Sequence, residues 1–430
     1  MRKEKTKVNQ KMKILREVQK TTRGITLIAL VVTIIVLLIL AGIALNLTIG
    51  QNGIFSRAQD ASNTWRNAEA NEQLAMQEGT DLIDQYLNGN GNDQGSGGEY
   101  NTGTTVSEAK NQNKFFENDT TIKDDLDNNV RVPEGFKIAE DSATKVEEGV
   151  VIEDKDGNQF VWIPAKTGEG VTVHTEAKGD VTIVYKRTAY SSNEATGETD
   201  SRTNSEKIKH SSSSRYYYTE ALPTDEETSV NAWGGYYIGR FEAGDKESTE
   251  AKTMRSGETD ATITIKKGQA PYNYITQANA KTKAEGMDTV QGYITATTKL
   301  VSSYAWDTAI SYIQIKNSDY GTNSPEGNYY NSDSFTYTDI KGVLKTKNNK
   351  SDTLIPTGQT TAVSNIYDMG GNLYEYTTES YSSEYYPYVE RGGDYNGSYG
   401  NRPAGYRNNT GSVVISSLGF RVTLYCSTES

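Results

Sequence analysis

The sequence predicts an α+β protein in which a long N-terminal helix, transmembrane over its first part, precedes a larger domain with few helices and much loop. Three observations support this fold class. Residues 25–49 contain no charged side chain, residues 88–104 contain six glycines, and from residue 150 onward short apolar runs alternate with turn residues. About 20 apolar residues suffice to cross the hydrocarbon core of a bilayer, whereas a glycine-rich polar stretch cannot bury enough surface to order its backbone.

The first 23 residues carry nine Lys or Arg against two Glu. Because positively charged flanks stay on the cytoplasmic side, we expect the N-terminus inside and nearly everything after residue 49 outside the cell. A secretory signal peptide is the alternative, but its apolar core is usually shorter and ends at a small-residue cleavage site. After the span, apolar residues recur at steps of three, four or seven, which predicts that the helix continues to about Leu87.

These boundaries divide the chain into four regions. We expect a basic leader over residues 1–24, a transmembrane helix over residues 25–87, a flexible linker over residues 88–129 and a folded domain over residues 130–430. The formal charge of −12 argues against nucleic acid or an anionic surface as a partner. The single cysteine, Cys426, permits no intrachain disulfide and is expected to be a spare thiol in a frayed tail.

Within the folded domain, residues 150–164 are typical of a strand, a turn at residues 154–158, and a second strand. The same Asp-x-Asp-Gly-Asn run could open a calcium loop, but its twelfth position is Ala165, where such a loop requires a bidentate Glu. Residues 235–244 predict a core strand. Residues 301–313 predict an amphipathic helix that is capped by Ser302 or Ser303.

Residues 171–228 are mostly polar and are expected to form long surface loops. The two histidines of the chain, His174 and His210, both lie in this stretch. They are too far apart and too isolated to indicate a metal site, and we expect both to be solvated.

The junction Arg23-Gly24-Ile25-Thr26-Leu27-Ile28 resembles the N-terminal region of type IV prepilins and pseudopilins. In that family a prepilin peptidase cuts after the glycine, the new N-terminus is methylated, and the helix anchors the subunit in the membrane or packs in a filament. The resemblance therefore implies cleavage between Gly24 and Ile25 and, as partners, the subunits of a pilus or pseudopilus. The fifth mature residue, normally Glu, is Ala29 here, which favours a tip subunit or a membrane-retained protein.

Five blocks of the folded domain resemble the formylglycine-generating, or sulfatase-modifying-factor, family. They are Phe160-Val-Trp-Ile-Pro, Tyr237-Ile-Gly-Arg-Phe-Glu, Tyr304-Ala-Trp-Asp-Thr-Ala, Ser364-Asn-Ile-Tyr-Asp-Met-Gly-Gly-Asn-Leu-Tyr-Glu-Tyr, and Glu390-Arg-Gly-Gly-Asp-Tyr-Asn with its later Gly419-Phe-Arg. The resemblance spans about residues 130–428 and implies a C-type-lectin-like fold with a small mixed sheet. Tyr376 replaces the usual Trp, and Asp394-Tyr395 replaces the usual Ser-Trp.

The oxidases of that family bind copper through paired cysteines that follow the Arg-Gly-Gly block, since soft thiolates select Cu(I). No cysteine lies between Gly392 and Arg421, and two distant histidines cannot supply the three-His iron site of other relatives. We therefore expect no enzyme activity, no copper and no iron.

The resemblance also implies a structural calcium site. Matched position by position, its ligands are the side chains of Asp368 and Glu375 and the carbonyls of Gly371 and Leu373. Two acidic groups and two carbonyls, completed by waters, suit Ca²⁺. In the alternative, Asp368 caps a turn and Glu375 pairs with an arginine, either Arg391 or Arg421.

Nine tyrosines lie between residues 374 and 406, interspersed with Asn, Ser, Gly and Arg. This mixture is typical of binding surfaces such as antibody paratopes and predicts an exposed ligand-binding face. It also resembles the target proteins of diversity-generating retroelements. The expected face consists of Tyr381, Tyr385, Tyr386, Tyr395, Asn396, Tyr399 and Asn401, while Tyr367 and Phe420 are expected in the core. In the alternative, several of these tyrosines pack the core instead.

These patterns predict a non-enzymatic display or adhesion protein at the cell surface or on a pilus. Its prepilin-type anchor would present a ligand-binding domain to an extracellular protein or glycan. A structural minor pilin or pseudopilin subunit is the alternative. A formylglycine-generating oxidase is the third possibility, which the missing cysteines disfavour.

Overall fold

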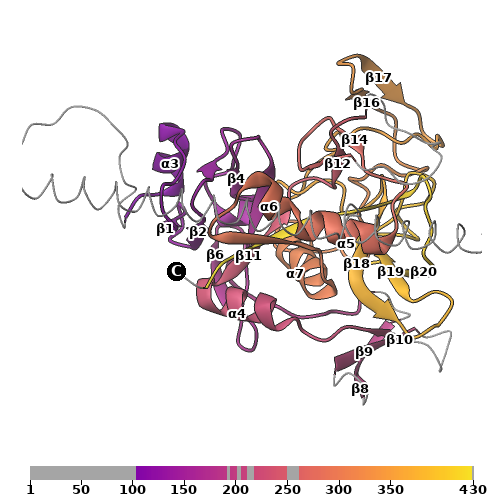
Figure 1. Ribbon diagram of the computed structural model, residues 1–430, viewed down its shortest axis with the longest axis horizontal. Helices are drawn as coiled ribbons and strands as arrows, with labels where there is room; N and C mark the ends of the chain where they lie inside the picture. Colours follow the sequence, from indigo (N-terminus) through magenta and orange to yellow (C-terminus); the bar gives the residue numbers. More distant parts are fainter. Residues whose placement is uncertain (1–102, 191–193, 201–204, 211–216, 249–260, 429–430) are drawn as a thin grey trace, which may run out of the picture. The chain divides into compact units, whose positions relative to one another are not determined.

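The structure is a computed structural model that describes residues 103–190, 194–200, 205–210, 217–248 and 261–428 (Figure 1). All of them belong to one unit, residues 97–430, whose framework is a six-stranded sheet and a seven-stranded sheet. The described helices are few and short. They are α3 (Val106–Gln112), the 3-10 turn η1 (Val146–Glu148), α4 (Thr224–Trp233), α5 (Gln277–Glu285), α6 (Met287–Gln291) and α7 (Ser303–Ile313).

The six-stranded sheet is antiparallel throughout and forms the centre of the core. Its order is β15 (Ala296–Leu300), β22 (Val422–Cys426), β11 (Gly235–Gly239), β5 (Gln159–Pro164), β4 (Val151–Glu153) and β3 (Lys137–Ile138). Every residue of β11 and of β22 is buried, as expected of strands that are covered on both faces. Helix α4 packs on β11 and β22, α5 on β15, and α7 on β5.

The seven-stranded sheet carries the C-terminal loops. Its order is β20 (Arg407–Thr410), β19 (Tyr388–Arg391), β18 (Tyr374–Tyr381), β10 (Tyr217–Thr219), β9 (Ser205–His210) and β8 (Glu194–Asp200), and β21 (Leu418–Phe420) pairs in parallel with β18. Only Arg421 separates β21 from β22, so the chain passes there from one sheet to the other. The buried Arg421 side chain donates to both carboxylate oxygens of Glu375 on β18, at 2.6 and 2.9 Å, and to the Gly239 carbonyl on β11 at 2.8 Å.

Smaller sheets surround these two. They are the hairpins β1 (Thr120–Lys123) with β2 (Asn129–Val132), β6 (Val171–Thr175) with β7 (Gly179–Ile183), and β16 (Phe335–Thr338) with β17 (Leu344–Lys347), and the trio β13 (Ile263–Thr264), β12 (Gly244–Asp245) and β14 (Ala270–Pro271). In Figure 1, β16 and β17 project at one end of the unit, whereas β1, β2 and α3 lie at the other.

Three local predictions are confirmed. Strands β4 and β5 form the expected hairpin around residues 154–158, and β11 is the expected core strand. Helix α7 begins where its cap was predicted, since the Ser302 side chain accepts a hydrogen bond from the Ala305 amide at 3.1 Å.

The predicted fold class is corrected on two counts. The domain is built on two sheets of six and seven strands instead of one small mixed sheet. Among the described residues, no helix is long and apolar enough to span a bilayer, and the longest, α7, has 11 residues. This finding runs against the predicted single-pass anchor and the cell-surface localisation. The predicted span at residues 25–87, with its processing site at Gly24 and Ile25, lies outside the described residues.

Three regions are more ordered than expected. The predicted linker, residues 88–129, contains α3 and β1 in its described part, because Thr105 and Glu108 form a reciprocal capping box and Val106 and Ala109 are buried. Residues 171–228, expected to be surface loops, include β6 to β10 and the first half of α4. Cys426, expected in a frayed tail, is a buried residue of β22 in the central sheet.

The two residues that were expected in the core differ in how deeply they are buried. Phe420 is fully buried against Tyr272, whereas Tyr367 is half-buried beside Phe241, with ring centres 5.1 Å apart. We expect Phe420→Ala to lower the free energy of unfolding by about 3–5 kcal/mol, as for other buried aromatic truncations. Tyr367→Ala should cost about 1–2 kcal/mol, within the range of ordinary substitutions. Urea denaturation of the intact chain measures both, and equal losses would contradict this assignment.

Candidate ligand-binding site

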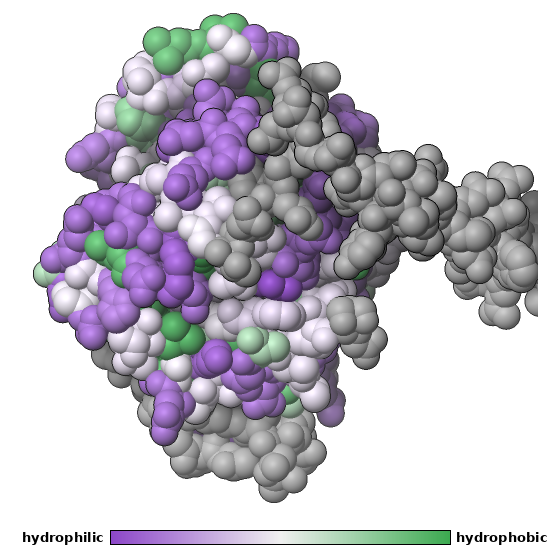
Figure 2. All heavy atoms as spheres, turned by 90° about the vertical axis from the view of Figure 1, so that its left-hand side faces the viewer, coloured by the Kyte–Doolittle hydropathy of each residue, from purple (hydrophilic) through white to green (hydrophobic). Residues whose placement is uncertain are grey.

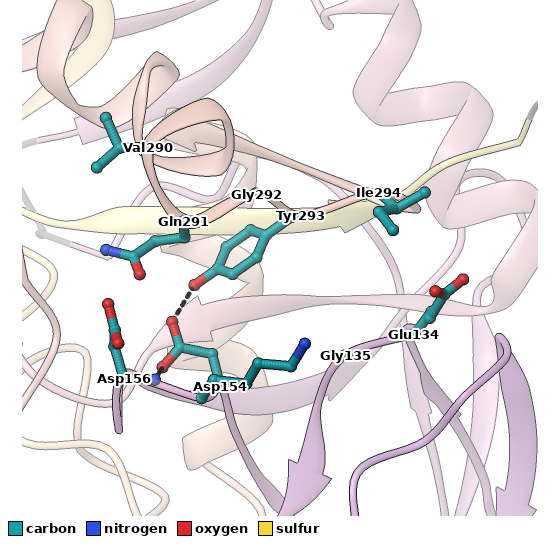
Figure 3. Close-up of a pocket in the computed structure, with 10 residues that line it drawn as sticks. Glu134, Gly135, Asp154, Asp156, Val290, Gln291, Gly292, Tyr293 and Ile294 are labelled. Carbon is teal, nitrogen blue, oxygen red and sulfur yellow. Dashed lines mark hydrogen bonds between the residues drawn. The ribbon is translucent and has the colours of Figure 1, made fainter. Parts of the chain in front are cut away.

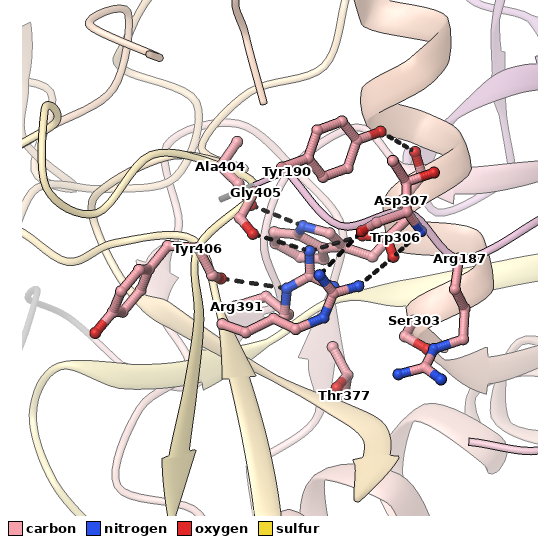
Figure 4. A network of polar contacts seen from close by, with 12 residues as sticks. Arg187, Tyr190, Ser303, Trp306, Asp307, Thr377, Arg391, Ala404, Gly405 and Tyr406 are labelled. Carbon is pink, nitrogen blue, oxygen red and sulfur yellow. Dashed lines mark hydrogen bonds and ion pairs between the residues drawn. The ribbon is translucent and has the colours of Figure 1, made fainter. Parts of the chain in front are cut away.

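A network of five charged side chains lies at the base of the C-terminal loops. Asp307 of α7 and Glu379 of β18 face Arg187, Arg391 of β19 and Arg407 of β20, and all five side chains are fully buried. Arg391 donates to Asp307 at 2.7 Å (Figure 4). Arg407 donates to Glu379 at 3.1 Å. Arg187 also pairs with Glu379, and Arg407 with Asp307. We call this set the five-charge network.

The arginines decide the charge state of Glu379. Burial alone would raise its pKa, but Arg407, Arg187 and Arg391 outweigh this effect and lower the pKa to about 2. Glu379 is therefore a carboxylate at neutral pH. Removing one partner from such a buried set leaves an uncompensated charge, which typically costs about 3–5 kcal/mol.

The network holds the loop between β19 and β20, residues 392–406. Arg391 donates to the carbonyls of Tyr406 and Gly405 at 3.2 and 3.3 Å. The indole of Trp306, the neighbour of Asp307 on α7, donates to the carbonyl of Ala404 at 2.9 Å (Figure 4). Side chains from α7 and β19 thus fix the end of the loop that leads into β20.

The outer part of the loop rests on residues 330–331. The carbonyl of Gly397 accepts a hydrogen bond from the Tyr330 amide at 2.8 Å, and the Tyr399 amide donates to the Asn331 side chain at 3.2 Å. Within the loop, Arg402 pairs with Asp394 at 3.2 Å. The loop is therefore held at its tip as well as at its end.

The seven residues of the predicted ligand-binding face differ in exposure. Tyr385 and Tyr386 are exposed on the turn between β18 and β19, with exposed fractions of 83% and 54%. Asn396 and Asn401 are exposed on the 392–406 loop, where Tyr399 is half-buried. The remaining two predicted residues, Tyr381 and Tyr395, are held by the protein interior.

Tyr395 is the clearest exception to the predicted face. Its side chain is buried with Leu354 and Leu373, and its hydroxyl group hydrogen-bonds to the Ser416 hydroxyl at 3.0 Å. Tyr381 is half-buried, and its ring lies 5.0 Å from that of Tyr218. Tyr395 is therefore a core residue, as the alternative predicted, whereas Tyr381 is only partly covered.

Tyr399 lines a cavity of about 320 Å³ between the 392–406 loop and the β16–β17 hairpin. Phe335 contributes a second aromatic ring to this Tyr399 cavity. The polar residues of the lining include Glu326, Asp333, Ser334, Gln359 and Thr360. The sequence indicated Tyr399 through its tyrosine-rich context but gave no signal for Phe335 or Gln359, which lie far away along the chain.

The four predicted calcium ligands lie close to this cavity, but their side chains already have protein partners. Both oxygens of Asp368 accept hydrogen bonds, from the Gly358 amide and the Thr360 hydroxyl, each at 2.7 Å. Both oxygens of Glu375 accept from Arg421. Asp368 therefore caps a turn and Glu375 pairs with an arginine, as the alternative interpretation of the sequence has it. Because both carboxylates are already hydrogen-bonded to protein groups, this arrangement does not fit a calcium ion. The carbonyls of Gly371 and Leu373 alone cannot hold one, and the described residues contain no cluster of three His, Cys, Asp or Glu side chains that could bind a metal ion.

A second cavity, of about 230 Å³, lies beside the β4–β5 turn (Figure 3). At its centre, the Tyr293 hydroxyl donates to Asp154 at 2.7 Å, and Asp154 also accepts from the amides of Asp156 and Asn158. The Asp154 carboxylate therefore stabilises the hairpin turn, which agrees with the hairpin interpretation of this sequence.

Comparison with known proteins identifies no family. Neither a family model nor a curated protein matches the chain. Among solved structures, CarF is 14% identical, with a TM-score of 0.31 over 45% of this chain and 87% of CarF. PvdO from Pseudomonas aeruginosa is 15% identical, with a TM-score of 0.32 over 64% of this chain and 97% of PvdO. Variable protein 1 of Treponema denticola is 14% identical, with a TM-score of 0.26 over 63% of this chain and 96% of that protein. Likenesses at these scores establish neither a shared fold nor a function.

The low pKa of Glu379 predicts a specific dependence of stability on acid. Because the folded-state pKa, about 2, lies below the ordinary value of 4.5, Glu379 stabilises the fold fully above about pH 4.5 and loses this effect as the pH falls through 2. Glu379→Gln should therefore cost about 3–5 kcal/mol at pH 7 and progressively less below pH 4.5. Urea denaturation between pH 2 and 7 measures the difference between the two proteins.

The exposed Glu176, which pairs with Lys145, provides the matched control. Glu176→Gln should change the free energy of unfolding by less than about 1 kcal/mol at any pH. Glu226, whose pKa burial raises to about 7, lowers stability as the pH rises from 4.5, but it does so equally in both proteins. A Glu379→Gln curve that ran parallel to the wild-type curve down to pH 2 would contradict the assignment.

Proposed function

We propose that the chain is a non-enzymatic binding protein that recognises a glycan in the Tyr399 cavity. The observation that carries this proposal is the combination of Tyr399 and Phe335 with polar groups in one cavity of about 320 Å³. Sites for small ligands are typically concave and about 300–1,000 Å³ in volume, with aromatic walls and a few polar groups that fix orientation. A sugar ring offers both an apolar face for the aromatic rings and hydroxyl groups for the polar ones.

The polar groups of the cavity are suited to hydroxyl groups. Gln359 accepts a hydrogen bond from the Thr338 amide through its carbonyl oxygen, at 3.0 Å, so its amide nitrogen can donate to a ligand. Asp333 and Ser334 are exposed on the segment that leads into β16, and each can accept from a sugar hydroxyl. Donors and acceptors are thus both present, as recognition of a hydroxyl group requires.

The hydrogen bonds that hold the 392–406 loop support the same proposal. Binding costs less when the residues that contact the ligand are already ordered. The Tyr399 amide is bonded to Asn331, and the end of the loop is bonded to Arg391 and Trp306. A ligand that enters the cavity therefore finds Tyr399 on a segment that is fixed on both sides.

The absence of an enzymatic role is part of the proposal and is supported by the positions of the cysteine and of His174. The lining of the Tyr399 cavity includes no histidine and no cysteine. Cys426 lies in the central sheet, where burial raises the pKa of its thiol and disfavours the reactive thiolate. His174 lies on β6, where its ring contacts Asp180 at 2.7 Å. Neither group is available for catalysis at the proposed site.

The test compares two tyrosine truncations in the intact chain on a glycan array. Tyr399→Ala should weaken binding to the recognised glycans by about tenfold or more, because a few aromatic anchors carry most of the binding energy at an interface. Tyr385→Ala, the same change at an exposed tyrosine on the β18–β19 turn, should leave binding unchanged. Melting curves of both variants should stay close to wild type. Loss of binding only in Tyr385→Ala, or no glycan bound by the wild-type chain, would contradict the proposal.

A further inference from the structure

A third and larger cavity, of about 560 Å³, lies at the other end of the unit from the β16–β17 hairpin. It is formed by the β1–β2 hairpin, β6 and the end of α4. Its lining includes Lys123, Lys166, Val171, Thr172 and Trp233. We call it the Lys166 cavity. The proposed glycan site shares no residue with it.

The walls of the Lys166 cavity are held in place by hydrogen bonds between separate segments. The buried Asn128 side chain accepts from the His174 amide at 2.8 Å and donates to the His174 carbonyl at 3.0 Å, which joins β6 to the β1–β2 hairpin. The Trp233 indole donates to the Ser427 carbonyl at 2.9 Å, and the Arg131 guanidinium lies 3.9 Å from its ring centre. The aromatic wall is therefore fixed before any ligand arrives.

The cavity contains a positive charge without a counter-ion. Lys166 is half-buried, and its ammonium group has no hydrogen bond or ion pair with any residue that the structure describes. Lys123, the other lysine of the lining, pairs with Asp127 at 3.3 Å. The Lys166 ammonium therefore adds an uncompensated positive charge to the lining of this cavity.

From these contacts we infer that the Lys166 cavity binds a sugar that carries a carboxylate, such as a uronic acid. The carboxylate pairs with the free ammonium of Lys166, and a charge-assisted hydrogen bond of this kind is stronger than a neutral one. The apolar face of the sugar ring packs against Trp233 and Val171. Its hydroxyl groups are within the reach of Thr172 and of Asn129, whose side chain is exposed and makes no hydrogen bond within the described residues.

The surface around the site favours a small ligand over a macromolecule. The face of the molecule that includes α3, β1 and β2 is mostly hydrophilic, with its apolar residues in small separate groups (Figure 2). A protein partner would ordinarily need a larger apolar patch at the centre of its interface. The negative formal charge disfavours a polyanion, whereas a single carboxylate needs only one cation, which Lys166 supplies.

Isothermal titration of the intact chain with glucuronate and with glucose tests the inference. Glucuronate should bind more tightly than glucose, because only glucuronate satisfies Lys166. Lys166→Met retains the length of the side chain and removes its charge, so it should weaken glucuronate binding by about tenfold or more. Lys166→Arg should restore most of that loss. Added salt should weaken the binding of glucuronate and leave that of glucose unchanged.

Two further variants test whether the effect is specific to this cavity. Lys341→Met makes the same change at an exposed lysine between β16 and β17 and should leave glucuronate binding unchanged. Asn129→Asp adds an acidic group to the lining and should weaken glucuronate binding while the melting curve stays close to wild type. Equal affinity for glucose and glucuronate, an unchanged affinity in Lys166→Met, or no glucuronate binding would overturn the inference. Tyr399→Ala should leave glucuronate binding intact, so this test is independent of the proposed glycan site.

Discussion

The charges buried between α7 and the seven-stranded sheet are the constraint on which the C-terminal half of the structure depends. Asp307 and Glu379 are stable in the interior only because three arginines reach them from separate segments of the chain. Each segment is therefore held in one position relative to the others. Arg391 also holds the loop that carries Tyr399, so the charge network and the proposed glycan site are linked through a single side chain.

A second buried charge pair connects the two sheets. Arg421 lies between β21 and β22 and binds Glu375 of β18, which fixes the point where the chain passes from one sheet to the other. Nearby, Glu242 accepts a hydrogen bond from Asn372, and burial raises its pKa well above the ordinary value. Because Arg421 is already paired with Glu375, Glu242 is best accommodated as a neutral acid. The segment from Asp368 to Glu375 is therefore held in place by hydrogen bonds and an ion pair to other residues of the protein.

The sequence predicted local elements well and long-range partners poorly. The β4–β5 hairpin and the cap of α7 depend on residues that are neighbours in the chain, so their patterns could be interpreted directly. The burial of Tyr395 depends on Leu354 and Ser416, and the Tyr399 cavity depends on Phe335, none of which is nearby in sequence. Polar composition also concealed structure: residues 171–183 form the β6–β7 hairpin because alternate residues such as Val173 and Ile183 are buried.

Hydrogen exchange in Asp307→Asn tests most directly whether the five-charge network holds the C-terminal loop. The amides of Ala404 and Gly405 donate to Ser324 and Gly321 next to the carbonyls that Trp306 and Arg391 bind. The account predicts that these amides exchange faster in the variant, while those of β11 in the central sheet keep their protection, since local opening need not involve the whole fold. Unchanged exchange at residues 404 and 405, or an equal loss of protection in β11, would contradict it.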